Sequence, residues 1–100
     1  MPKVIVLFEK PSDVEGFEKH YFEVHVPLAQ RVKEVSGAAV QRVLSTQNTD
    51  LTLYLVTELT FDSKEALEFA LASEEWAKVT EDVSNLMNYL EKPPIVTVVE

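Results

Sequence analysis

The sequence predicts one α+β domain with the element order β-α-β-β-α-β. Four short segments rich in β-branched and apolar residues alternate with two regions in which apolar residues recur at helical spacing. The chain has 100 residues, which suits a single hydrophobic core. It has no cysteine, and 46% of its residues are hydrophobic, so we expect a compact fold without disulfides, thiolate metal sites or a cysteine nucleophile.

The charge balance limits the partners. The formal net charge is −8, from 17 acidic against 9 basic residues. Such a chain lacks the basic patch that binds phosphate backbones, so we expect no nucleic-acid partner and no attraction to anionic membranes. The N-terminal segment has one base and a short apolar run, which predicts neither a signal peptide nor a spanning helix, and we expect a cytoplasmic location.

The first strand is expected at residues 3–8, an almost unbroken apolar run. A helix should follow, because Ser12 and Glu15 have the spacing of a capping box. Its apolar stripe is formed by Phe17, Tyr21, Val24 and Leu28.

Pro27 interrupts this helix. It has no amide hydrogen to donate, and its ring disfavours helical backbone at Val26, so we expect a kink or break near His25. The helix should then resume to about Glu34 and stop at residues 36–37.

The two middle strands are expected at residues 38–45 and 51–61, joined by a polar connection of hairpin length. Asp62 and Glu65 repeat the capping-box spacing at the start of the second helical region. Ser73 is expected to cap a further helix.

That last helix carries an apolar stripe of Trp76, Val79, Val83, Leu86 and Met87. Two prolines at 93–94 end it, and residues 95–99 form the last strand. Two βαβ halves joined by a central hairpin make the split βαβ, ferredoxin-like arrangement.

The strands are apolar on both faces, which predicts a homodimer. In this arrangement the helices cover one face of the sheet, and a solvated second face should be polar. The expected strands do not alternate in this way: the first places Val4, Val6 and Phe8 opposite Ile5 and Leu7, and the third places Leu55 and Leu59 opposite Val56. Whichever face the helices leave open therefore carries an apolar patch. Packing against a second copy would cover this patch through a two-fold axis. Strands that are simply apolar, or a last strand that changes position, are the alternatives.

His25 and Tyr21 are the candidate catalytic residues. They are four positions apart, so the imidazole and the phenol can share one helix face beside the break at Pro27. A neutral imidazole can act as general base, and the phenol can donate to a developing oxyanion. The alternative is a half-buried histidine that satisfies its own kinked backbone.

His20 is a weaker candidate for ligand binding. On an α-helix it projects about 140° from His25, so the two imidazoles would not share a metal ion. With no further histidine or cysteine, we expect no metal site. The alternative places His20 at the border of the core beside Phe17 and Val24.

A cleft between helices and sheet is expected to take a small-molecule ligand. Its candidate lining residues are Phe8, Tyr54, Trp76 and Met87, for each of which ordinary core packing is the alternative. Glu58 interrupts an apolar strand, and we expect it at an edge or paired with a base such as Arg42.

Two segments carry a family resemblance. Residues 17–28 are similar to the signature F-x-x-H-Y-x-x-x-H-x-P-L, and the segment from Ser73 through Asp82 and Asn85 is similar to a second-helix pattern S-x-E…D…N. With these segments the chain resembles the EthD-like family of the dimeric α/β-barrel superfamily. The resemblance implies a ferredoxin-like protomer, a homodimer, and a cleft in each protomer faced by His25 and Tyr21.

The resemblance leaves the chemistry open, because relatives in that superfamily include cofactor-free monooxygenases, isomerases, cyclases and haem-degrading enzymes. Our first hypothesis is a cofactor-independent enzyme of proton-transfer, monooxygenase or isomerase/cyclase type, acting on a small apolar oxygenated or aromatic compound. The second is a non-catalytic binding or accessory module of a degradation pathway. A haem-binding version, with His25 as axial ligand, is the third, and no cofactor is assigned.

Overall fold

The computed structural model describes residues 1–100 and confirms the predicted α+β, ferredoxin-like protomer. The strands are β1 (Lys3–Glu9), β2 (Val35–Arg42), β3 (Leu53–Phe61) and β4 (Ile95–Val99). The helices are α1 (Val14–His20), the π-helix η1 (Tyr21–His25), α2 (Val26–Gln30), α3 (Lys64–Leu71) and α4 (Glu74–Leu86). The sheet has the order β2-β3-β1-β4, and all its strand pairs are antiparallel.

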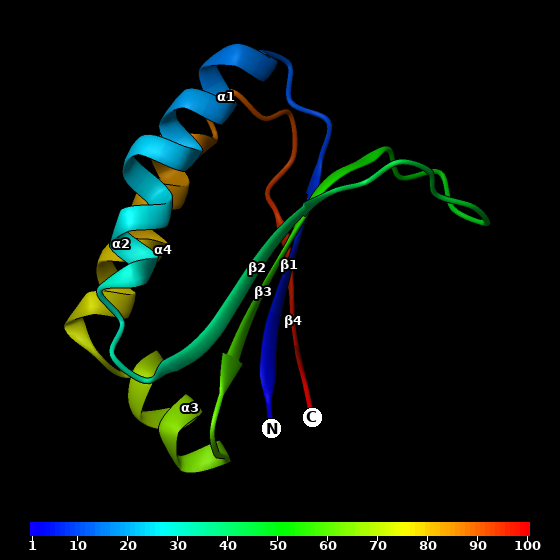
Figure 1. Ribbon diagram of the computed structural model, residues 1–100. Coiled ribbons are helices and arrows are strands. Elements are labelled where there is room, and N and C mark those ends of the chain that lie inside the picture. The colour runs from blue at the N-terminus through cyan, green and yellow to red at the C-terminus, as the bar shows by residue number, and fades with distance from the viewer.

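The molecule has two layers (Figure 1). The segments α1, η1 and α2 form one continuous helical rod that runs beside α4, and both cover the same face of the sheet. No helix lies over the opposite face. None of the helices has both the length and the apolar character needed to cross a bilayer.

The core lies between the layers and follows the alternation along the central strands. Val4 and Phe8 of β1 and Leu55 and Leu59 of β3 are buried under the helices. Their neighbours on the other side of the sheet are only half covered: Ile5, Leu7, Val56 and Glu58. The predicted division of residues between the two faces of β1 is therefore confirmed.

Two helix starts differ from the prediction by one residue. Asp13, not Ser12, caps α1 and accepts a hydrogen bond from the Gly16 amide at 3.0 Å. Ser63, not Asp62, caps α3. Each pair of neighbours contains two good capping residues, so the local pattern alone does not decide between them. The predicted cap Ser73 of α4 is confirmed.

The first helical region ends earlier than predicted. It stops at Gln30 rather than Glu34, and tighter turns then bury Val32 under the sheet. Consequently β2 begins at Val35, and Gly37 lies in the strand instead of ending a helix. Burial of Val32 in the core stabilises this early end.

The irregularity expected at Pro27 is present as a wider turn instead of a kink or break. The Val26 amide donates to the Tyr21 carbonyl, five residues earlier, which defines η1. Pro27 follows this wider turn in the first turn of α2, and it has no N–H to donate to the turn before it.

Arg42 does not pair with Glu58. Its guanidinium lies 2.7 Å from the carboxylate of Glu18 on α1. The register explains this, because Arg42 is opposite Leu55 on the helix-covered side whereas Glu58 is opposite Ile5 on the other face.

Candidate functional site

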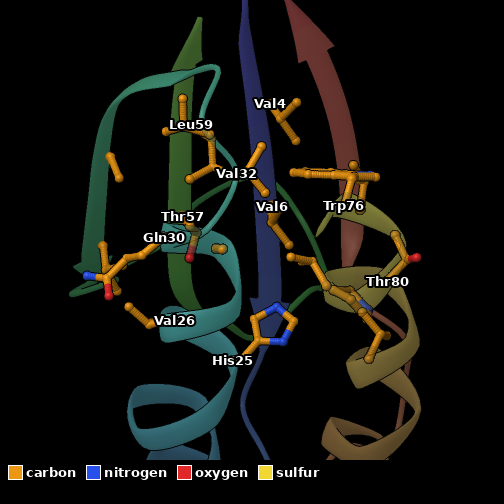
Figure 2. Close-up of a pocket in the computed structure, with 18 of the residues that line it drawn as sticks. Val4, Val6, His25, Val26, Gln30, Val32, Thr57, Leu59, Trp76 and Thr80 are labelled. Carbon is orange, nitrogen blue, oxygen red and sulfur yellow. The ribbon is translucent and has the colours of Figure 1, made fainter. Parts of the chain in front are cut away.

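A pocket of about 500 Å³ lies between the helix-covered face of the sheet and the pair α2–α4. It is lined by 24 residues, 17 of them hydrophobic, and none is an aspartate, glutamate, lysine or arginine. Figure 2 shows His25 extending from the helix into this space, with Trp76 and the valines of β1 around it. His25 is therefore the one lining side chain that ordinarily titrates near neutral pH.

Asp82 of α4 holds the imidazole of His25. Its Oδ2 atom lies 2.8 Å from His25 Nδ1, and the side chain of His25 is only 12% exposed. Because an ionised carboxylate can only accept, the proton of a neutral His25 is on Nδ1. The Nε2 atom then carries the free lone pair, and it makes no hydrogen bond to the protein.

Asp82 is the centre of a polar cluster. His20 Nε2 donates to its two oxygens at 2.8 and 3.0 Å, and the Asn85 amide donates at 2.9 Å. The carboxylate is 4% exposed and has partners for both oxygens. Such a buried charge is stable because it is hydrogen-bonded from three sides.

The π-helix brings the two histidines together. Residues five apart diverge by about 140° on an α-helix, but a turn closed between residues five apart stacks them on nearly the same side. His20 and His25 therefore both reach Asp82. No group of three or more histidine, cysteine, aspartate or glutamate side chains is arranged to hold a metal ion.

Burial lowers the pKa of His25, and the charge of His20 acts in the same direction. The hydrogen bond and charge of Asp82 oppose this shift without reversing it. For Asp82, burial alone would raise the pKa, but hydrogen bonds from Asn85, His20 and His25 outweigh it, and the pKa lies below its usual value. The cluster thus combines an ionised carboxylate with a neutral His25.

Tyr21 lies under the imidazole of His25. The two rings stack with centroids 5.5 Å apart and planes 25° apart, so they pack against each other rather than share a hydrogen bond. The Tyr21 hydroxyl is instead hydrogen-bonded to Thr57 of β3. Burial raises the pKa of Tyr21, and the Thr57 hydrogen bond offsets part of this shift, so the phenol stays protonated.

The candidate ligand-binding residues divide into two groups. Phe8 and Trp76 line the pocket together with His25 and Tyr21. The other three do not line it. His20 lies behind His25 on Asp82, Tyr54 donates to Glu18, and Met87 packs against the buried cluster around Phe8.

Three polar residues of the site had no role assigned from the sequence. They are Asp82 and Asn85, which entered only through the family pattern, and Thr57, for which the sequence suggested no contact. Asp82 lies three residues after Val79 and four before Leu86, both buried in α4. A carboxylate on the apolar stripe of a helix is the signal that predicts a buried partner.

The comparisons with known proteins agree with this architecture. The family model described as the EthD domain matches residues 9–89. An uncharacterised 11.0 kDa protein of the thcB–thcC intergenic region of Rhodococcus erythropolis is 32% identical over 85 residues, which cover 85% of this chain and 82% of that protein.

Two solved structures show the same fold. An EthD-family protein of Bacillus halodurans has a TM-score of 0.85 at 28% identity, over 100% of this chain and 97% of that one. An antibiotic biosynthesis monooxygenase has a TM-score of 0.64 at 17% identity, with the same coverage of both chains, and this likeness shows the fold alone. Since the EthD model spans most of the chain, including His20, His25 and Asp82, the protein belongs to the EthD family.

Proposed function

We propose that this protein is a cofactor-independent enzyme that moves a proton on a small, uncharged and largely apolar compound. The observation that carries the proposal is His25, which lies in an apolar pocket with Nδ1 bound to the buried carboxylate of Asp82. This pairing orients the imidazole, leaves Nε2 free as general base, and stabilises the imidazolium that forms when Nε2 takes a proton.

Tyr21 is proposed to orient this base and to assist it. Its ring stacks on the imidazole, and its hydroxyl is bonded to Thr57. When Thr57 donates to the phenol oxygen, the phenol proton is available to an oxygen of the ligand. A protonated phenol in an apolar pocket stabilises a developing oxyanion more strongly than the same group in water.

The pocket supports an uncharged ligand. The lining offers no ammonium or guanidinium group, so an anionic ligand would lose its hydration without gaining a partner. The volume of about 500 Å³ falls in the range of small-molecule sites. Trp76 and the surrounding valines suit an aromatic or cyclic compound with one polar group directed at His25.

The test uses 5-nitrobenzisoxazole, a neutral aromatic probe with one acidic C–H. A base removes this proton, its electron pair forms the nitrile, and the N–O bond breaks to give a coloured cyanophenolate. Stabilisation of the protein by the probe in a thermal-shift assay would report binding, and absorbance would report cleavage. We expect saturable cleavage by the wild type and loss of cleavage with retained binding in His25→Gln.

The control variant is Lys19→Gln, which changes an exposed residue on the same helical rod and should leave cleavage unchanged. If the wild type binds the probe at His25 without cleaving it, the non-catalytic binding module replaces the enzyme. A Soret shift on titration with haemin that depends on His25 would instead support the haem-binding version.

We further propose that the uncovered face of the sheet pairs with a second copy of the chain. Ile5, Leu7 and Val56 lie side by side on this face, and no helix covers them. The same face carries both Lys3 and Glu58. A face that carries both charges suits a two-fold interface in which Lys3 of one copy meets Glu58 of the other.

A further inference from the structure

Two imidazoles share one buried carboxylate in this protein. We propose that His20 is a positioning residue that carries the positive charge of the cluster and thereby helps burial to keep His25 neutral. The effect of His20 on catalysis rests on the proposed function, because it acts through the base His25. The charge distribution itself does not depend on any reaction.

The surroundings allow only one cation. Asp82 supplies the single negative charge from α4, and His20 faces it from α1. Two phenols also lie beside the histidines, that of Tyr21 from η1 and that of Tyr89 after α4. The sheet contributes the neutral Thr57, and the pocket lining holds no acid. A second imidazolium would therefore have no counter-charge, and two like charges on one carboxylate disfavour each other.

The geometry assigns the charge to His20 rather than His25. His20 reaches both oxygens of Asp82, at 2.8 and 3.0 Å, whereas His25 reaches one. The side chain of His20 is 19% exposed and that of His25 is 12% exposed. A cation at His20 keeps more of its hydration, and a cation at His25 would lie against apolar side chains.

The consequence for catalysis is a base that is ready at neutral pH. With His20 protonated, the cluster is neutral overall and His25 keeps the Nε2 lone pair. Removal of His20 would leave the whole charge of Asp82 to His25. The pKa of His25 would then rise, and a larger fraction of it would be cationic and inactive as a base at neutral pH.

The experiment is a pH titration by NMR of protein labelled with ¹⁵N-histidine, which reports the charge and tautomer of each imidazole without any substrate. In the wild type we expect His20 to become imidazolium at a pH where His25 is still neutral with its proton on Nδ1. In His20→Gln we expect the pKa of His25 to rise by roughly 0.5 or more. Lys19→Gln, which removes an exposed cation from the same helix, should leave the pKa of His25 unchanged.

Protonation of His25 before His20 in the wild type would overturn the proposal, as would an unchanged or lower pKa of His25 in a folded His20→Gln. The wild-type arm needs no variant, so poor folding of His20→Gln would not prevent the test. If the histidines titrate as expected but the wild type does not cleave the probe, only the proposed enzyme is contradicted. The pH profile of cleavage tests both proposals together. If the acid limb moves to higher pH in His20→Gln and the plateau rate is retained, both the charge assignment and the proposed enzyme are supported.

Discussion

Oδ2 of Asp82 lies 2.8 Å from Nδ1 of His25, and this contact joins α4 to the π-helix that carries the candidate base. The two residues are 57 positions apart in the chain. The contact explains why a carboxylate lies on the apolar stripe of α4, and it gives the imidazole a defined tautomer.

Replacement of this carboxylate should weaken the fold and the site together. In Asp82→Asn the amide has one acceptor oxygen for two imidazole donors, and its NH₂ group faces the Asn85 donor. We expect a loss of about 2 kcal/mol in the free energy of unfolding, the scale of charge-assisted buried hydrogen bonds. Denaturant unfolding measures it, with the neighbouring exposed acid in Glu81→Gln as control, which should change stability by less than about 0.5 kcal/mol.

The stability of the wild type should fall as the solution is acidified below neutral pH. The pKa of His25 is lowered in the folded protein, so below its ordinary value of 6.5 the unfolded chain binds a proton that the folded chain does not. Stability is therefore lost as pH falls through 6.5 and levels off at the folded pKa. Thermal unfolding between neutral pH and the pKa of the carboxylates measures this slope.

The slope should be shallower in His25→Gln, because that variant has no group at this position to protonate. Asp82 contributes to the pH dependence of stability in a lower pH range. Its pKa is depressed, so its stabilisation is full above the ordinary value of 3.8 and is lost as pH falls through the folded value. Identical slopes in wild type and His25→Gln would contradict the assigned direction for His25.

The Tyr21–Thr57 hydrogen bond should be measurable by a double-mutant cycle. Both groups are buried, and Thr57→Val keeps the shape of the side chain while removing its hydroxyl. We expect Thr57→Val and Tyr21→Phe each to lose about 1–2 kcal/mol of unfolding free energy, since each leaves a buried hydroxyl without its partner. The double variant should lose less than the sum, with a coupling of about 1 kcal/mol, and strict additivity would show that the bond contributes nothing.

Gly16 is required by close packing between α1 and the chain after α4. A Cβ at this position would lie 2.6 Å from the ring of Tyr89 and would also meet the carboxylate of Asp13. We expect Gly16→Ala to lose about 1–2 kcal/mol in spite of the better helix propensity of alanine. Urea unfolding measures this change.

Gly37 is the matched control, because a Cβ there would meet Thr60 only at 3.7 Å, an ordinary contact. Gly37→Ala should change stability by less than about 0.5 kcal/mol. Equal effects of the two substitutions would show that the packing of Tyr89 on α1 is looser than the structure indicates.

The proposed dimer is tested by a charge on the uncovered face. Val56→Arg places a cation among Ile5, Leu7 and their strand neighbours, so the two copies should separate. Leu44→Arg is the control, because Leu44 is 98% exposed in the loop between β2 and β3 and lies off this face. Light scattering after size exclusion should give a dimer for the wild type and Leu44→Arg and a monomer for Val56→Arg, whereas a monomeric wild type would contradict the proposal.

Much of the fold was predictable because its signals are local. The β-branched residues of β4 begin directly after two prolines, and the predicted bounds, residues 95–99, are those of the structure. Where the signals are not local, tertiary contacts determine the bounds of the elements. Backbone amides of Ser12 and Asp13 donate to the Tyr89 carbonyl, at the far end of the chain, and this anchoring helps to set where α1 begins.

The site was predictable only in part. Pro27 indicated that the backbone near His25 is irregular, because a proline inside a helical pattern disturbs the helix. The role of His20 could not be predicted, because α-helical geometry placed it away from His25 and only the π-helix brings both to Asp82. Pairing across two helices depends on how the helices pack, which residue spacing within one helix does not specify.

The most direct test of the central claim compares the second-order rate constant for cleavage of 5-nitrobenzisoxazole by the wild type and by His25→Gln at neutral pH. A positioned general base contributes a factor of about 10²–10⁴, so the rate constant should fall by at least about 100-fold in the variant while the probe still binds. Equal rates in the two proteins, or a wild type that binds the probe without cleaving it, would contradict the assignment of His25 as a base.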